Sequence, residues 1–119
     1  MSQNFQTGDF LIFQIESGYG LLRLFGIEER EDEKIWYLQA FNELFLDVET
    51  ADSVLANPSS LTINIPYVGL TNRAFQATQT ARMLNIPLTD EEKQVFDEWK
   101  NSQTDEPVDR SIRLMLGLR

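Results

Sequence analysis

The chain has 119 residues, of which 42% are hydrophobic and 24% charged, a composition typical of a single globular domain. Ten basic residues face nineteen acidic ones, and the formal charge of −9 argues against binding to nucleic acids or anionic membranes. The absence of Cys and His excludes disulfides, thiol nucleophiles, His-ligated metals and imidazole-based catalytic triads.

The N-terminal residues and the apolar stretches indicate a cytoplasmic protein. Residues 1–5 lack the basic and apolar regions of a signal peptide. The longest near-apolar stretches, 10–15 and 20–27, are far shorter than the roughly 20 residues that a membrane span needs.

Residues 8–27 predict an antiparallel hairpin. Gly8-Asp9 is a turn signal that opens a strand over 10–16, in which Leu11, Phe13 and Ile15 share one face, which we expect to be buried. Residues 17–20 contain two glycines and suit the turn. Residues 21–27 form the returning strand.

Three further strands are expected before residue 67. A polar loop over 28–34 leads to a strand over 35–41 and a fourth strand over 44–48. Residues 50–56 suit one or two helical turns with Thr50 as the N-cap. A fifth strand over 61–65 alternates with period two, and Pro66 ends it or marks a sheet edge.

The pattern changes to helical spacing after residue 70. Thr71 is the expected N-cap of a helix over 72–84. Thr89 and Glu92 form a capping-box sequence for a helix that runs to about Ser102. The segment 107–117 suits either a helix or a strand, and Pro107 near its start with Gly117 near its end favours the helix.

Strands followed by helices predict an α+β fold rather than a parallel sheet with crossover helices. We expect one domain over 1–119, with a small antiparallel SH3-like β-barrel of about five strands over 1–66. Two or three C-terminal helices over 67–119 would pack on it. A barrel is the most economical arrangement for five short strands, because closure removes exposed strand edges.

The first hairpin resembles a known family. Gly8-Asp9-Phe10-Leu11-Ile12-Phe13-Gln14-Ile15, followed by Gly18-Tyr19-Gly20-Leu21-Leu22-Arg23-Leu24-Phe25-Gly26-Ile27, is similar to the opening of small SH3-like-barrel immunity proteins of bacterial polymorphic toxin systems. The resemblance covers about twenty residues. It implies a non-enzymatic inhibitor that binds a toxin.

The excess negative charge lies almost entirely in the first half of the chain. Residues 1–60 hold three basic and eleven acidic residues, a net charge of −8, whereas 61–119 have a net charge of −1. This asymmetry suits binding to another protein with a basic surface, although acidic residues also serve solubility. Tyr19, in a turn between two glycines, is the expected aromatic anchor. The expected partner-binding acids are Glu28, Glu29, Glu31, Asp32 and Glu33.

Three functional interpretations remain open at this point. The chain is an inhibitor or immunity-type protein, an accessory or adaptor subunit of a larger assembly, or a small carboxylate enzyme or divalent-cation binder. Glu43, Asp47 and Glu49 are the carboxylates that an enzyme would use, but no motif assigns an acid and a base. The acidic loop lacks the spacing of a calcium-binding loop. We therefore predict a non-enzymatic protein-binding module with no catalytic residue, cofactor or metal site.

Overall fold

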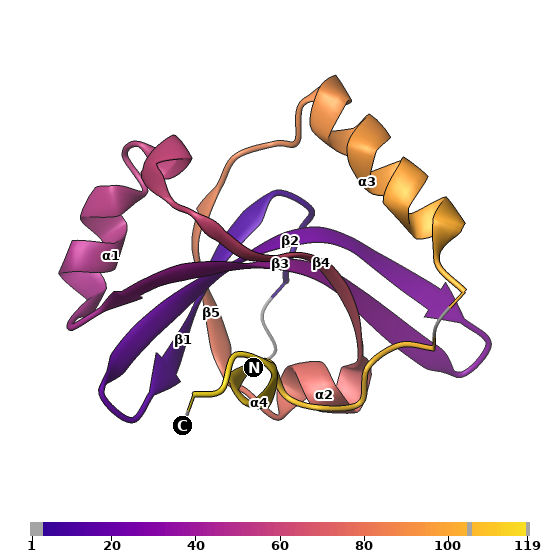
Figure 1. Cartoon of the computed structure of the whole chain (residues 1–119), viewed down its shortest axis with the longest axis horizontal. Coiled ribbons are helices and arrows are strands. Elements are labelled where there is room, and N and C mark those ends of the chain that lie inside the picture. The colour runs from indigo at the N-terminus through magenta and orange to yellow at the C-terminus, as the bar shows by residue number, and fades with distance from the viewer. Residues whose placement is uncertain (1–3, 105, 119) are drawn as a thin grey trace.

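The computed structural model describes residues 4–104 and 106–118, which form an antiparallel sheet and four short or medium α-helices (Figure 1). The α+β class is therefore confirmed. The strands are β1 (Asp9–Ile15), β2 (Gly18–Arg30), β3 (Glu33–Phe45), β4 (Ile63–Thr71) and β5 (Thr80–Asn85). The helices are α1 (Val48–Val54), α2 (Asn72–Gln76), α3 (Asp90–Ser102) and α4 (Ile112–Met115), with a 3₁₀ turn at Pro58–Ser60.

The sheet is open rather than closed into a barrel. Its strand order is β4-β3-β2-β1-β5, and every neighbouring pair is antiparallel. Within the described residues no ladder joins the two edge strands, β4 and β5, so the expected closure is wrong. Register shifts bend the long β2–β3 hairpin, and the sheet curves strongly (Figure 1).

The main core lies on the sheet face that α2 and α4 cover. Leu11, Phe13 and Ile15 of β1 all belong to this core and are at most 5% exposed, which confirms the predicted facing. They pack with side chains of β2, β3 and β4 and with Phe75 of α2. A Cβ at Gly20 would lie 2.4 Å from the Phe13 ring, so the close approach of β2 to this ring requires glycine.

The opposite sheet face is covered at its two ends by different helices (Figure 1). At one end, Ala51 and Leu55, in and after α1, pack in a cluster with Phe10 and Phe41. At the other end, α3 packs in an aromatic layer, in which the centres of neighbouring rings lie 5.2 to 6.1 Å apart. The rings are those of Phe25, Tyr37, Tyr67, Phe96 and Trp99.

Arg23 is a buried cation between the sheet and α3. Its guanidinium donates to the Glu92 carboxylate at 2.5 Å and to the Ile86 carbonyl at 2.9 Å. It also lies 5.0 Å from the centre of the Phe10 ring and 5.6 Å from that of Phe25. A buried charge needs partners of this kind, so Arg23 fixes where α3 begins.

The polar segment 28–34 is mostly strand, not loop. Glu28–Arg30 continues β2, Glu33–Lys34 begins β3, and only Glu31 and Asp32 form the connecting turn. Two-residue connections of this kind join antiparallel strands tightly, and Glu31 adopts a positive φ of 48° there. The pairing of Glu29 with Lys34 and of Arg30 with Glu33 places opposite charges across the ladder, which favours the extension.

The expected fourth strand over 44–48 is also wrong. Residues 44 and 45 are the end of β3, and Val48 already begins α1. The N-cap of α1 is Asp47 rather than Thr50, because the Asp47 carboxylate accepts from the Thr50 backbone N–H at 2.8 Å. The expected fifth strand is present and longer than expected, since β4 continues beyond Pro66 to Thr71.

The expected helix over 72–84 is divided between a helix and a strand. Thr71 is its N-cap, as predicted, and its hydroxyl accepts from the Ala74 N–H at 3.1 Å. The helix ends at Gln76, and residues 80–85 form β5 beside β1. The expected division of the chain at residue 66 is therefore wrong, because it falls within β4 and the second part supplies an edge strand.

The last two helices follow the predicted pattern in part. The capping box of α3 is confirmed: the Thr89 hydroxyl accepts from the Glu92 N–H, and the Thr89 N–H donates to the Glu92 carboxylate. In the ambiguous segment, Val108 forms a bridge with Leu70, and the helix that was favoured is limited to Ile112–Met115.

Candidate functional site

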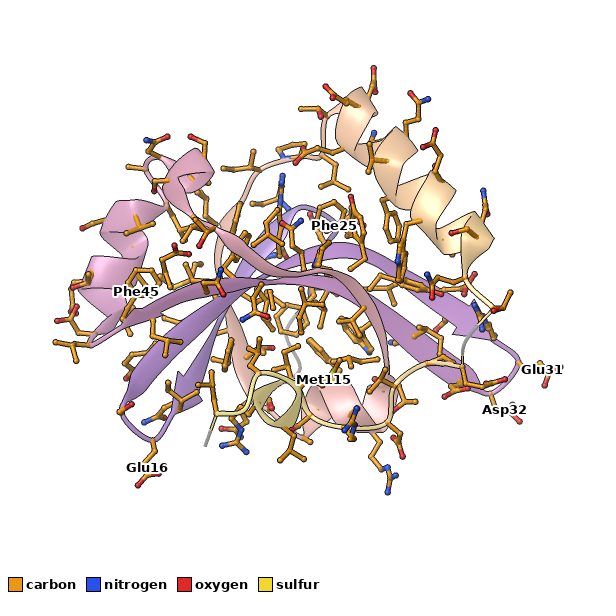
Figure 2. The ribbon with its side chains drawn as sticks, in the orientation of Figure 1. Glu16, Phe25, Glu31, Asp32, Phe45 and Met115 are labelled. Carbon is orange, nitrogen blue, oxygen red and sulfur yellow. The ribbon has the colours of Figure 1, made fainter. Side chains whose placement is uncertain are left out.

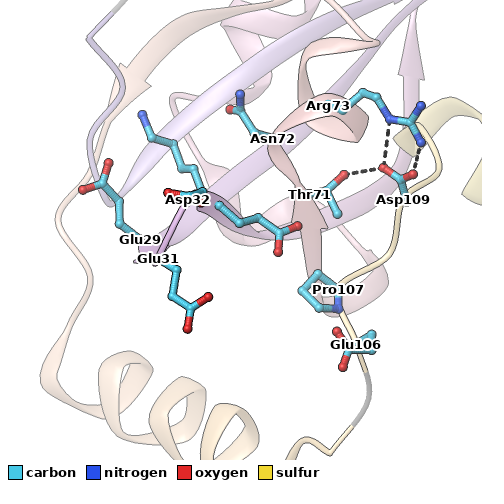
Figure 3. A pocket seen from close by; sticks show the side chains of 11 residues that line it. Glu29, Glu31, Asp32, Thr71, Asn72, Arg73, Glu106, Pro107 and Asp109 are labelled. Atoms are coloured by element: carbon cyan, nitrogen blue, oxygen red, sulfur yellow. Dashed lines mark hydrogen bonds and ion pairs between the residues drawn. The ribbon is translucent and has the colours of Figure 1, made fainter.

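The acidic groove lies beside the tip of the β2–β3 hairpin (Figure 3). It has a volume of about 680 Å³, and its walls come from the hairpin tip, the junction of β4 with α2 and the segment before α4. Six of the side chains that line it are carboxylates, against two cations, Lys34 and Arg73. The carboxylates are Glu29, Glu31, Asp32, Glu33, Glu106 and Asp109. The groove is therefore strongly negative.

One of the two cations is already neutralised within the groove. Arg73 forms an ion pair with Asp109, and the Thr71 hydroxyl donates to the same carboxylate at 2.6 Å. The Arg73 and Thr71 donors hold the pKa of Asp109 below its usual value, and Asp109 in turn raises the pKa of Arg73. The ammonium of Lys34, the other cation, lies 5.6 Å from the centre of the Trp36 ring.

Four of the expected partner-binding acids meet in this groove. Glu29, Glu31, Asp32 and Glu33 are all exposed, and none of their side chains has a hydrogen bond or ion pair to a residue that the structure describes. Acids that stabilise a fold are normally paired or cap a helix, whereas these four are concentrated at an exposed tip. Their arrangement fits attraction of a cationic partner.

Glu28, the fifth expected acid, has a different environment. Its carboxylate accepts from the Tyr37 hydroxyl at 3.0 Å and pairs with Arg30 at 2.6 Å and Lys100 at 3.1 Å. Partial burial alone would raise the pKa of Glu28, but the donors from Lys100, Tyr37 and Arg30 outweigh it and lower the pKa. Glu28 thus ties the hairpin to α3 and is a structural acid.

An aromatic pocket adjoins the acidic groove. It has a volume of about 340 Å³ and lies between the end of α3, β3, β4 and the connection to α4. Tyr37, Tyr67 and Trp99 line it, and the Tyr67 and Trp99 rings are 5.3 Å apart between centres. Glu106 and Pro107 line both this pocket and the acidic groove, so the two lie side by side.

Tyr19, the expected aromatic anchor, does not lie beside the acids. It stands at the opposite end of β2, eleven positions from Arg30, on a strand that rises about 3.3 Å per residue. Its side chain is half-buried and packs against the cluster beneath α1. Its role as an anchor stays a prediction, separate from the groove.

The carboxylates considered for an enzyme have structural contacts. Glu43 accepts from the backbone N–H and the hydroxyl of Thr62 at 2.8 and 2.7 Å, and Asp47 caps α1. Burial would raise the pKa of Glu43, but the Thr62 donors lower it; the Thr50 donors lower that of Asp47. Among the described residues, no group of three or more His, Cys, Asp or Glu is arranged to hold a metal ion.

Sequence reasoning found the hairpin acids but missed the opposite wall of the groove. Glu106 and Asp109 are distant from the hairpin in the chain and are brought to it by the pairing of Val108 with Leu70, whereas Arg73 is brought there by the pairing of β4 with β3. Trp36, Tyr37 and Trp99 lie in the core or between the sheet and the helices. Tyr67 carried no signal of its role.

Comparison with known proteins yields no relative. No protein-family model matches the chain, and neither the curated proteins nor the solved structures include a match. In the part of the chain that the structure describes, no helix has the length and apolar character needed to cross a membrane.

Proposed function

We propose that this chain is a non-enzymatic protein-binding module whose acidic groove binds a basic partner protein. The observation that carries the proposal is the group of unpaired carboxylates at the hairpin tip, which share one groove with Glu106. Lys34 is the one cation of the described groove lining that is not in an ion pair with another lining residue. A surface of this charge accelerates encounter with cationic partners and selects them.

The adjoining aromatic pocket supports a protein as the partner. Interfaces gain most of their affinity from a few aromatic or Arg contacts that lose their water, and charged rims add mainly association rate. Tyr67 and Trp99 are half-buried, line the pocket next to the acidic groove and are suited to stack on a Lys or Arg side chain. The groove thus attracts a basic partner electrostatically, and the pocket binds one of the partner's Lys or Arg side chains.

The immunity-type role is the specific version that we favour. The resemblance of the first hairpin to immunity proteins supports it, as does the acidic groove, since an inhibitor of a basic effector needs a negative surface. The strand order, in which β5 returns to pair with β1 after a short helix, supports an SH3-like arrangement of the open sheet. The same surface in an adaptor subunit would bind a basic neighbour in its assembly.

Affinity capture with three matched proteins tests this function. The first is the wild type, the second has Glu29, Glu31 and Glu33 replaced by Lys, and the third has Glu16, Glu49 and Asp52 replaced by Lys. The second and third proteins change the net charge equally, but only the second alters the groove. We expect a stoichiometric basic partner to be captured from native lysate by the wild type and by the third protein only.

Capture that survives the groove reversal, or that both reversals remove equally, would contradict a specific role of the groove. Tyr19→Ala belongs in the same series, because loss of capture in this variant would show that the partner extends along the whole hairpin. Circular dichroism of each variant checks that the fold is intact.

A further inference from the structure

A further pocket, separate from the acidic groove and the aromatic pocket, lies where β1 runs past the end of β5. The pairing of β1 with β5 stops at Phe13 and Thr80, while β1 continues to Ile15. The pocket has a volume of about 380 Å³ and is lined by the end of β1, by the turn between α2 and β5, and by α4. In Figure 2, the labels of Glu16 and Met115 mark two of these elements, the β1–β2 turn and α4.

Two hydrogen-bonding atoms in the walls of this pocket have no partner. They are the hydroxyl oxygen of Thr78, a residue that is only 4% exposed, and Nε of Arg113. Buried polar groups in folded proteins are almost always hydrogen-bonded. Two atoms without a partner in the walls of one pocket therefore indicate that a bound group would supply the missing hydrogen bonds.

Arg113 differs from the other buried arginine in this respect. Arg23 also has an unpaired Nε, but its remaining nitrogens bond to Glu92 and Ile86. The Arg113 side chain has no hydrogen bond or ion pair to any described residue, although it is half-buried and has lost part of its water. Its planar fork of N–H donors is the group that proteins use to bind carboxylates with two parallel hydrogen bonds.

We propose that this pocket binds a carboxylate group, presented either by a chain terminus or by an acidic side chain. Arg113 would supply the fork, and the Thr78 hydroxyl and the Gln14 and Gln79 amides surround it with further donors. The pocket lining also includes Glu16, which is exposed at the edge and disfavours a doubly charged anion such as phosphate. A singly charged carboxylate suits this balance best.

The proposal does not depend on the acidic groove. The two sites share no lining residue, have opposite chemistry and are built from different elements. A protein with both would be able to recognise a cation at the hairpin tip and a carboxylate beside α4.

Side-chain NMR of the ¹⁵N-labelled full chain tests the pocket directly, because the Nε–H signal of each arginine reports its own hydrogen bonds. One probe is N-acetylglycylglycine, which presents a terminal carboxylate, and the other is N-acetylaspartate amide, which presents a side-chain carboxylate. We expect the Arg113 signal to shift and saturate with a half-saturation concentration on the order of 1 mM. The probe with the lower half-saturation concentration identifies the source of the carboxylate.

Matched variants separate binding from general effects. Arg113→Lys keeps the charge but removes the fork together with its Nε–H signal, so binding to this variant is followed on the backbone amide signal of Thr78. We expect it to weaken at least about tenfold. Thr78→Val keeps the size of the buried side chain and should weaken binding less. The exposed Arg110 serves as the control: its own signal should show no saturable change, and Arg110→Lys should leave the saturable shift of Arg113 intact.

Three results would overturn the proposal. One is the absence of a saturable Arg113 shift in the millimolar range, and another is an equal shift of Arg110. The third is a shift of the Arg113 signal in Glu16→Gln without any probe, together with no binding by the wild type. That result would show that Glu16 itself occupies the guanidinium in solution.

Discussion

The two ends of the β2–β3 hairpin are built for different purposes. At the end that holds Tyr19 and Phe45, α1 closes over aliphatic and aromatic side chains, and Phe45 is only 7% exposed. At the other end, α3 covers an aromatic layer but stops short of the tip, where Glu31 and Asp32 remain exposed (Figure 2). The first end is organised for packing, and the second leaves charge uncompensated.

This difference shows where the fold tolerates side chains and backbone that do not contribute to its stability. Like charges at an exposed tip repel one another and contribute no packing, and Glu31 adopts a left-handed conformation that favours glycine. Glu28, a few residues away, is paired on three sides. The contrast between Glu28 and its neighbours is what makes the tip a better candidate for binding than for stability.

The largest expected effect lies in the covered core. Phe13→Ala removes a ring that is 2% exposed and leaves a cavity opposite Gly20, so we expect a loss of about 3–5 kcal/mol in the free energy of unfolding. Urea denaturation measures it, with the exposed Gln14→Ala as the control. A loss below about 1 kcal/mol would mean that the face of β1 that holds Phe13 does not pack in this core.

The next effect concerns the attachment of α3. Arg23→Ala removes the ion pair with Glu92 and the hydrogen bond to Ile86, and we expect a loss of about 2–3 kcal/mol. The loss stays below that of a fully buried pair because the Glu92 side chain is 34% exposed. Arg23→Lys keeps the charge, so its free energy of unfolding should lie between those of Arg23→Ala and the wild type. An unchanged stability of Arg23→Ala would show that α3 is held by its aromatic layer alone.

The same ion pair predicts a dependence of stability on pH. Burial would raise the pKa of Glu92, but the Thr89 N–H and Arg23 outweigh it and lower the pKa below its unfolded value near 4.5. The stabilisation is therefore complete above that unfolded value and is lost as the pH falls through the lower folded pKa. Glu92→Gln should flatten this acid limb of the stability profile, and an unaltered limb would contradict the assignment.

A smaller effect is expected at the start of α3. Thr89→Ala removes the hydroxyl of the capping box and should cost about 1 kcal/mol without changing capture of a partner. Thr89→Ser keeps the hydroxyl, so its free energy of unfolding should remain close to that of the wild type. Equal losses in the two variants would point to the methyl group rather than to the cap.

The smallest effect separates the tip from the rest of the fold. Glu31→Gly relieves the positive φ and should stabilise the protein by roughly 0.5–1 kcal/mol while slowing association with a basic partner. Asp32→Gly removes the same charge at a position without a positive φ, so it should not stabilise. If neither variant alters association, the two turn acids have no part in binding.

The elements that could be predicted from the sequence are those set by neighbouring residues. The Leu11, Phe13 and Ile15 alternation, the Thr71 cap and the Thr89 capping box all act within a few positions, and all three are confirmed. The strand over 80–85 could not be predicted in the same way. Its side chains are mostly exposed without alternation, and its partner β1 lies about seventy positions earlier.

The groove was predictable only on one side for the same reason. The hairpin acids are consecutive in the chain, so their charge is visible in the sequence, whereas Asp109 joins them through pairing of Val108 with Leu70. The charge of segment 28–34 predicts a loop, and this prediction is wrong. The cross-strand pairing of Glu29 with Lys34 makes that charge compatible with a ladder.

The most direct test of the account is the association rate of the captured partner with the groove variant and the matched control. Surface plasmon resonance at about 50 and 300 mM salt screens exposed charges to different extents. We expect the Glu29, Glu31 and Glu33 reversal to slow association by about ten- to a hundredfold at low salt, with little change in dissociation. The reversal of Glu16, Glu49 and Asp52 should have only a small effect. Association that is independent of salt, or slowed equally by both reversals, would contradict the acidic groove as the binding surface.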